Sequence, residues 1–333
     1  MQFQDIIKEI KQSQFRSIYL LSGEEPYFID KIAEALEQKV LKEEEKSFNQ
    51  SILYGSETSM QAVLGEARRY PMMSERVLVV VREAQHLKNW ELLESYAENP
   101  QPSTVLVLAH KHKKVDKRRK AIKLIKDRHL LFEAKRVYDN QMPDWIQRSL
   151  KNRRLEVTPK AAQLLAESLG TDLARVENEL DKLALIAEPG QSVDDQLVEA
   201  NIGISKDFNN FELQRAIVER DFKKIMRIQR YYAANPKDHP LVLTLAVLFN
   251  FASKLMVAHQ ASDKSPRALA ATLKVNPFFV KDYTQALRHY DLKKCARMIG
   301  YLREADLRSK GVGNAQTPEH ELLKELLFKM YHV

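Results

Sequence analysis

The most informative candidate for chemistry is the stretch from Ser22 to Asp30, which follows a short apolar run and precedes a helical pattern. A functional phosphate-binding loop has the spacing G-x-x-x-x-G-K-[ST]: its amides surround the phosphates, its lysine reaches the β and γ groups, and its hydroxyl binds Mg²⁺. Gly23 fits the first position, but Phe28, Ile29 and Asp30 replace the second glycine, the lysine and the hydroxyl residue. The pattern indicates either a degenerate phosphate loop or an ordinary strand-to-helix turn.

Acidic residues near this stretch also argue against hydrolysis. Glu24 and Glu25 put negative charge where a triphosphate requires cations. Glu83 follows the apolar run 77–81, where an active site places an acidic pair that holds Mg²⁺ and polarises water, but it is a single carboxylate. We interpret Glu83 as a solvated strand end. Because the sequence also lacks a nucleophile elbow, a G-x-G-x-x-G fingerprint and an H-E-x-x-H string, we expect no intrinsic catalysis and no cofactor.

Positive charge is concentrated in one segment after the apolar run 104–109. Its cations are Lys111, Lys113, Lys114, Lys117, Arg118, Arg119 and Lys120. Ligands of open α/β sheets bind at the carboxyl ends of the strands, so contact with DNA phosphates or with another subunit is one interpretation. A solvated loop and helix surface is the more common meaning of such a run. His110 and His112 alternate as on a strand, but no third ligand is near in sequence, so we expect no metal there.

These residues are positioned by alternating strand and helix patterns in the first 138 residues. The strand patterns lie at 17–21, 51–54, 77–81, 104–109 and 130–132. Helical apolar spacing occurs between them, for example at 31–42 and 59–69. The runs at 77–81 and 104–109 are apolar on both faces, as in central strands covered by helices on both sides. This rhythm is typical of an α/β fold with a parallel, doubly wound sheet.

Helix boundaries dominate the rest of the chain, where the strand patterns stop. Thr158 before a proline predicts a helix start, and Gly170 followed by Thr171 predicts a helix end and a new start. Ser192 with Asp195 predicts a capping box. X-Pro pairs break the pattern again after residue 208. We expect three domains, namely an α/β domain at 1–138, a small helical domain at 139–206 and a helical domain at 207–333.

The composition is that of a globular protein, with 44% apolar and 29% charged residues. The single cysteine, Cys295, excludes an intramolecular disulfide. Charged residues interrupt the first fifteen positions, so we expect no secretory signal and a cytoplasmic protein. The apolar stretch 241–258 contains Thr244 and Lys254, which predicts a buried helix and no membrane span. The net charge of +8 favours contact with a polyanion.

Several strings resemble signatures of bacterial DNA polymerase III delta subunits. They are IYLLSGEEPYFI at 18–29, ARRYPMMSER at 67–76, the basic segment at 111–120, and GTDLARVENELDKL at 170–183. The strings span the first two expected domains, and the length and helical character of the third domain agree with the family. The resemblance implies a RecA-like, AAA+-like domain with a degenerate nucleotide site, a small helical lid and a helical collar that assembles with other subunits.

The resemblance also implies a role for Tyr70, Pro71, Met72 and Met73, which we call the plug loop. Family members present a hydrophobic plug here, and methionine suits an adaptable binding surface. We expect Pro71 to end the preceding helix and both methionines to project from the domain. The alternative is that they pack beneath the sheet edge.

The implied function is clamp loading: the chain binds and opens the sliding clamp (beta subunit) without hydrolysing ATP. The implied partners are the clamp, the clamp-loader ATPase and delta-prime subunits, and primer-template DNA. The alternatives are an active AAA+-type ATPase, against which Ile29 argues, and another basic DNA-processing enzyme such as a nuclease, for which the sequence places no carboxylates together.

Overall fold

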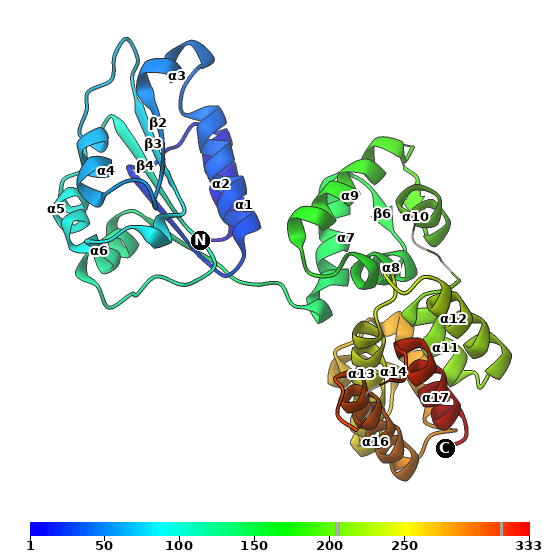
Figure 1. Cartoon of the computed structure of the whole chain (residues 1–333). Coiled ribbons are helices and arrows are strands. Elements are labelled where there is room, and N and C mark those ends of the chain that lie inside the picture. Colours follow the sequence, from blue (N-terminus) through cyan, green and yellow to red (C-terminus); the bar gives the residue numbers. More distant parts are fainter. Residues whose placement is uncertain (189, 204, 206, 314–315) are drawn as a thin grey trace. The chain divides into compact units, whose positions relative to one another are not determined.

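The computed structural model describes residues 1–188, 190–203, 205, 207–313 and 316–333. The chain divides into two compact units, Met1–Val137 and Tyr138–Val333 (Figure 1). The predicted boundary between residues 206 and 207 lies inside the second unit, and residue 206 is outside the described residues. The assignment of three domains therefore stays a prediction.

The first unit is built on a five-stranded sheet with the order β2-β3-β4-β1-β5. Its strands are β1 (Ile18–Gly23), β2 (Gln50–Tyr54), β3 (Val77–Arg82), β4 (Thr104–His110) and β5 (Leu130–Ala134). All neighbouring strands pair in parallel. The predicted parallel sheet is confirmed, and each predicted strand is found with no end shifted by more than two residues.

Helices cover both faces of this sheet, which explains why its central strands are mostly apolar and are buried along almost their whole length (Figure 1). One face carries α1 (Phe3–Lys11) and α2 (Pro26–Lys39), and the other carries α4 (Met60–Ala67), α5 (Leu93–Glu98) and α6 (Lys120–Arg128). The short α3 (Glu43–Asn49) leads into the edge strand β2. The 3₁₀ turns η1 (Ala84–His86) and η2 (Trp90–Leu92) follow β3.

The second unit is almost wholly helical. Its helices are α7 (Met142–Asn152), α8 (Pro159–Leu169), α9 (Leu173–Ile186), α10 (Asp195–Ile202), α11 (Asn210–Val218), α12 (Phe222–Ala234), α13 (Leu241–Gln260), α14 (Pro266–Leu273), α15 (Val280–Ala286), α16 (Leu292–Ser309) and α17 (Glu319–Tyr331), with 3₁₀ turns η3 (Asp139–Gln141) and η4 (Pro277–Phe279). The helical class predicted for this part is confirmed. One expectation is wrong: β6 (Glu156–Val157) pairs in parallel with β7 (Ser192–Val193), and two-residue strands are too short to leave a pattern in the sequence.

Helix caps were predicted with mixed success. Thr158 caps α8 by accepting a hydrogen bond from the amide of Ala161, as predicted. Thr171 and Ser192 are not caps: the aspartates Asp172 and Asp194 accept from the amides three residues on. Each of these aspartates lies one or two residues beyond the predicted hydroxyl residue, and aspartate is an equally good acceptor at this position.

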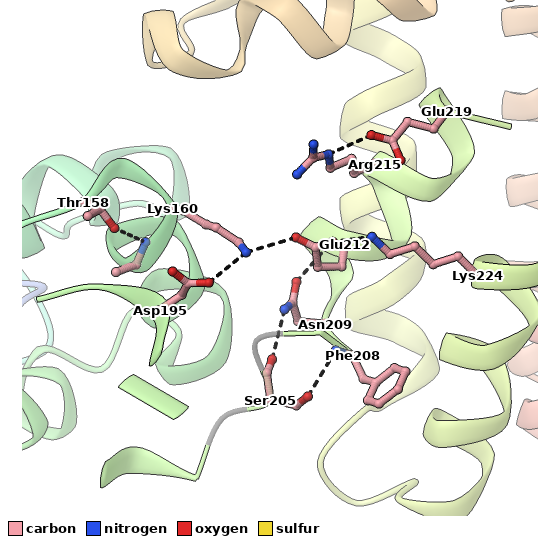
Figure 2. A network of polar contacts seen from close by, with 11 residues as sticks. Thr158, Lys160, Asp195, Ser205, Phe208, Asn209, Glu212, Arg215, Glu219 and Lys224 are labelled. Carbon is pink, nitrogen blue, oxygen red and sulfur yellow. Dashed lines mark hydrogen bonds and ion pairs between the residues drawn. The ribbon is translucent and has the colours of Figure 1, made fainter. Parts of the chain in front are cut away.

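A buried ion-paired carboxylate joins the first four helices of the second unit to the helices that follow (Figure 2). Glu212 of α11 places one oxygen 2.5 Å from Nζ of Lys224 and the other 3.4 Å from Nζ of Lys160. Lys160 belongs to α8 and also pairs with Asp195 of α10 at 2.8 Å. Because a buried carboxylate is costly without cationic partners, these contacts tie α8 and α10 to α11 and α12. They give a physical reason why these helices form one compact unit.

Helix α13 is the one helix among the described residues with the length and apolar content to cross a membrane. Leu248, Phe251 and Leu255 are fully buried in the core of the second unit. Val242 and Phe249 on the same helix are exposed. The prediction of a buried helix is therefore right for one face and wrong for the other, and the buried face makes α13 part of the core.

Candidate functional site

The loop between α4 and β3 exposes large apolar side chains. Tyr70, Met72 and Met73 are 79%, 59% and 102% exposed. The methionines therefore do not pack beneath the sheet edge, and that alternative is wrong. The prediction that Pro71 ends the preceding helix is also wrong, because α4 already ends at Ala67. The proline instead disfavours helical geometry at the residue before it and keeps the loop out of the helix.

The sheet itself brings a second segment to this loop. Because β2 and β3 are parallel neighbours, the residues that precede them meet at the amino ends of the strands. Phe48 and Asn49 precede β2, and Asn49 hydrogen-bonds the main chain of Met72. Phe48 is 60% exposed, and its carbonyl accepts a hydrogen bond from Arg69 at 2.8 Å. Sequence reasoning missed both residues, because their only signal is the pairing of two strands far apart in the chain.

The degenerate phosphate loop is filled by the protein's own groups. A Cβ at Gly23 would lie 2.0 Å from the carbonyl oxygen of Ala134, so glycine is required there by the neighbouring strand. The amide of Glu24, which a phosphate loop would offer to its ligand, donates to the same carbonyl at 3.0 Å. Phe28 and Ile29 are buried, and the Phe28 ring lies 6.4 Å from that of Phe132. The two side chains that replace the second glycine and the lysine of a phosphate loop therefore pack into the core of the domain.

Two acidic residues of this loop, Glu24 and Asp30, are paired with the basic segment that follows β4. The strand ends are neighbours, with Ser22 opposite His110, so the segment runs beside the loop. Nζ of Lys111 lies 2.6 Å from Asp30, and Nζ of Lys114 lies 3.1 Å from Glu24. The sequence showed the two opposite charges separately, and the fold brings them together.

The other cations of the segment are mostly paired as well. Lys117 pairs with Glu133 at 2.5 Å, and Lys120 pairs with Glu94. Arg118 holds Asp116 by two side-chain hydrogen bonds, which lower the pKa of that carboxyl to about 2. These contacts reduce the charge that the segment offers to a polyanion.

Two cations of the segment, Lys113 and Arg119, form no ion pair with a described residue. Both line a cavity of about 480 Å³ at the carboxyl ends of β3 and β4, together with Lys88, Trp90 and His110. Burial lowers the pKa of His110, so this imidazole adds no charge at neutral pH. Contact of the segment with DNA or with another subunit stays a prediction, and these two side chains are its best candidates.

Hydrolytic chemistry finds no support in the side chains near this edge. Glu83 directly follows β3 and is half-exposed, and its carboxylate lies 3.6 Å from Nε2 of His86. This agrees with the interpretation of a solvated strand end. Within the part of the chain that the structure describes, no three His, Cys, Asp or Glu side chains gather in a way that could hold a metal ion.

Comparisons with known proteins agree with the resemblance seen in the sequence. Residues 19–135 match the family model for the DNA polymerase III delta subunit, and residues 207–328 match the model for its C-terminal domain. The DNA polymerase III subunit delta of Bacillus subtilis is 26% identical over 318 residues, which cover 92% of this chain and 91% of that protein.

A solved structure, the Bacillus subtilis DNA clamp loader delta protein, covers 100% of both chains with 25% identity and a TM-score of 0.57. The two family models together cover most of the sequence, and their order along the chain is that of the two parts of the delta subunit. The chain therefore belongs to the family of DNA polymerase III delta subunits.

Proposed function

We propose that this chain binds the sliding clamp through the plug loop and opens it for loading onto primed DNA, as the delta subunit of a clamp loader. The observation that carries the proposal is the exposure of Met72 and Met73, which do not pack into the core of the domain. Their loop lies in the part of the chain that matches the delta-subunit family model. Exposed apolar side chains of this size are typical of protein interaction sites. The partners are the clamp, the loader's ATPase and delta-prime subunits, and primer-template DNA, in the cytoplasm.

The chain performs this function without hydrolysing ATP. Phe28 and Ile29 occupy the space of the phosphates, and Asp30 is neutralised by Lys111. These features support a site that does not bind nucleotide, and they disfavour the alternative of an active ATPase. No observation favours a nuclease or another DNA-processing enzyme.

Clamp opening is tested with the sliding clamp of the same bacterium, loaded on nicked circular DNA and separated from free clamp. Added in the absence of nucleotide, the purified chain should release the clamp from the DNA. The Met72→Ala, Met73→Ala double variant at the same concentration is the control and should release little. Release that requires ATP, or equal release by the variant, would overturn the proposal.

Nucleotide binding is tested separately by calorimetric titration of the purified chain with Mg-ATP. We expect no heat of binding and no phosphate release. Micromolar binding, or turnover that is lost on changing Glu83, would contradict the proposed absence of hydrolysis.

A further inference from the structure

Asn49 is a buried polar residue, 1% exposed, at the last position of α3. Its side chain reaches the plug loop, which is 23 residues away in sequence. Neither the proposed clamp contact nor the core of the sheet explains why an amide is buried here. The inference below rests on the proposed function, because it concerns how the plug loop is presented.

The amide group of Asn49 makes three hydrogen bonds. Its Nδ2 donates to the carbonyl oxygen of Met72 at 2.9 Å and to that of Glu45 at 3.1 Å. Its Oδ1 accepts from the amide nitrogen of Met72 at 2.7 Å. One side chain thus binds both polar main-chain groups of Met72, and the bond to Glu45 anchors that side chain to α3.

The plug loop has little other support. Within the described hydrogen bonds of the chain, those from Asn49 are the ones that reach the main chain of residues 70–73. Met73 has a φ of 53°, in the left-handed region that non-glycine residues rarely adopt. Such a conformation persists only where its surroundings hold it, and it is common at functional sites.

We propose that Asn49 is a positioning residue that holds the plug loop in its clamp-binding conformation before the clamp arrives. Asn49 is buried and does not contact the clamp. A loop that is already in its bound conformation loses less conformational entropy on binding. If the loop were released into many conformations, the apparent affinity would fall in proportion to the fraction that remains competent.

The test measures clamp binding by surface plasmon resonance for Asn49→Ala beside the wild type. We expect affinity to fall about 10-fold, as it would if about a tenth of the loops remained competent. The matched control is Ser59→Ala, which removes the side-chain N-cap of the neighbouring helix α4. It leaves the hydrogen bonds of Met72 intact. The control should bind the clamp as the wild type does, although it also loses stability.

Two further measurements separate positioning from general destabilisation. Hydrogen exchange of the Met72 amide should be much faster in Asn49→Ala, because its acceptor is gone, and unchanged in Ser59→Ala. In the Met72→Ala, Met73→Ala background, adding Asn49→Ala should cause no further loss of clamp affinity, because the side chains that the loop presents are already absent.

Asn49→Asp provides a second variant if Asn49→Ala does not fold. It keeps the size of the side chain and the acceptor for the Met72 amide, but it sets a buried carboxylate oxygen against the carbonyl oxygens of Met72 and Glu45. We expect a loss of affinity at least as large as that of Asn49→Ala. If both Asn49 variants fold and bind the clamp like the wild type while the methionine double variant does not, the positioning role is wrong and the proposed function stands. If the methionine double variant itself binds normally, the plug assignment is wrong, whatever Asn49 does.

Discussion

The plug loop and the degenerate phosphate loop belong to the same parallel sheet, but they differ in what their apolar side chains do. The plug loop precedes β3 and exposes Met72 and Met73. The phosphate loop follows β1 and buries Phe28 and Ile29. Since the strands are parallel, the two loops lie at opposite ends of the sheet.

The two loops differ both in how their apolar side chains pack and in how their charges are paired. At the carboxyl end, apolar side chains fill the phosphate space and ion pairs such as Lys111–Asp30 neutralise the remaining charge. At the amino end, one buried amide, that of Asn49, holds an apolar loop in solvent. Residues of the first loop should therefore matter for folding, and those of the second for binding.

The largest effect is expected for Phe28→Ala. Phe28 is buried against the rings of Phe3 and Phe132, so its loss should lower the free energy of unfolding by about 3–5 kcal/mol. The measurement is urea unfolding followed by circular dichroism. Clamp affinity of the folded fraction should be unchanged. If Phe28→Ala lost little stability but much clamp affinity, the phosphate loop would matter for binding and not for folding.

The converse change is Met72→Ala with Met73→Ala. Truncation of central interface side chains should weaken clamp binding by at least about 100-fold, measured by surface plasmon resonance. The free energy of unfolding should change by no more than about 0.5 kcal/mol, because the side chains are exposed. If the variant instead melts far below the wild type, the plug-loop methionines contribute to folding as the buried side chains of the phosphate loop do.

A smaller effect is expected for the cations beside the phosphate loop. The double variant Lys113→Ala, Arg119→Ala removes the two side chains that have no acidic partner among the described residues. We expect the slope of log K for DNA binding against log salt concentration to fall in magnitude by up to about 2. The matched control, Lys111→Ala with Lys117→Ala, removes the same charge from paired positions and should change the slope less. Fluorescence anisotropy with primer-template DNA at several salt concentrations gives both slopes. Equal slopes for the two double variants would show that ion pairing does not decide which cations reach DNA.

The smallest effect is expected for Asp30→Asn. Its partner Lys111 is mostly buried but Asp30 is half-exposed, so the pair should contribute less than about 1 kcal/mol to stability, and less at high salt. Urea unfolding at low and high salt measures this. ATP binding should remain absent, because Phe28 and Ile29 still fill the space. Calorimetric detection of ATP binding by this variant would show that charge, and not packing, had closed the loop.

Much of the fold could be predicted from local patterns. Apolar runs on both faces identified β3 and β4 because central strands bury both sides. The two-residue strands β6 and β7 could not be predicted, since so short a pairing leaves no periodicity. The exposed face of α13 was missed for a related reason: an apolar sequence does not say which side chains find a partner.

The candidate site divides in the same way. Residue types alone determined that Ile29 cannot act as a phosphate-loop lysine, whereas Met72 and Met73 became a candidate binding pair through the resemblance to the delta-subunit family. Only the tertiary structure decided that Lys111 faces Asp30 and that Asn49 holds Met72. Both contacts join segments brought together by neighbouring parallel strands, and the order of strands in a sheet is a property of the whole domain and not of any local stretch of sequence.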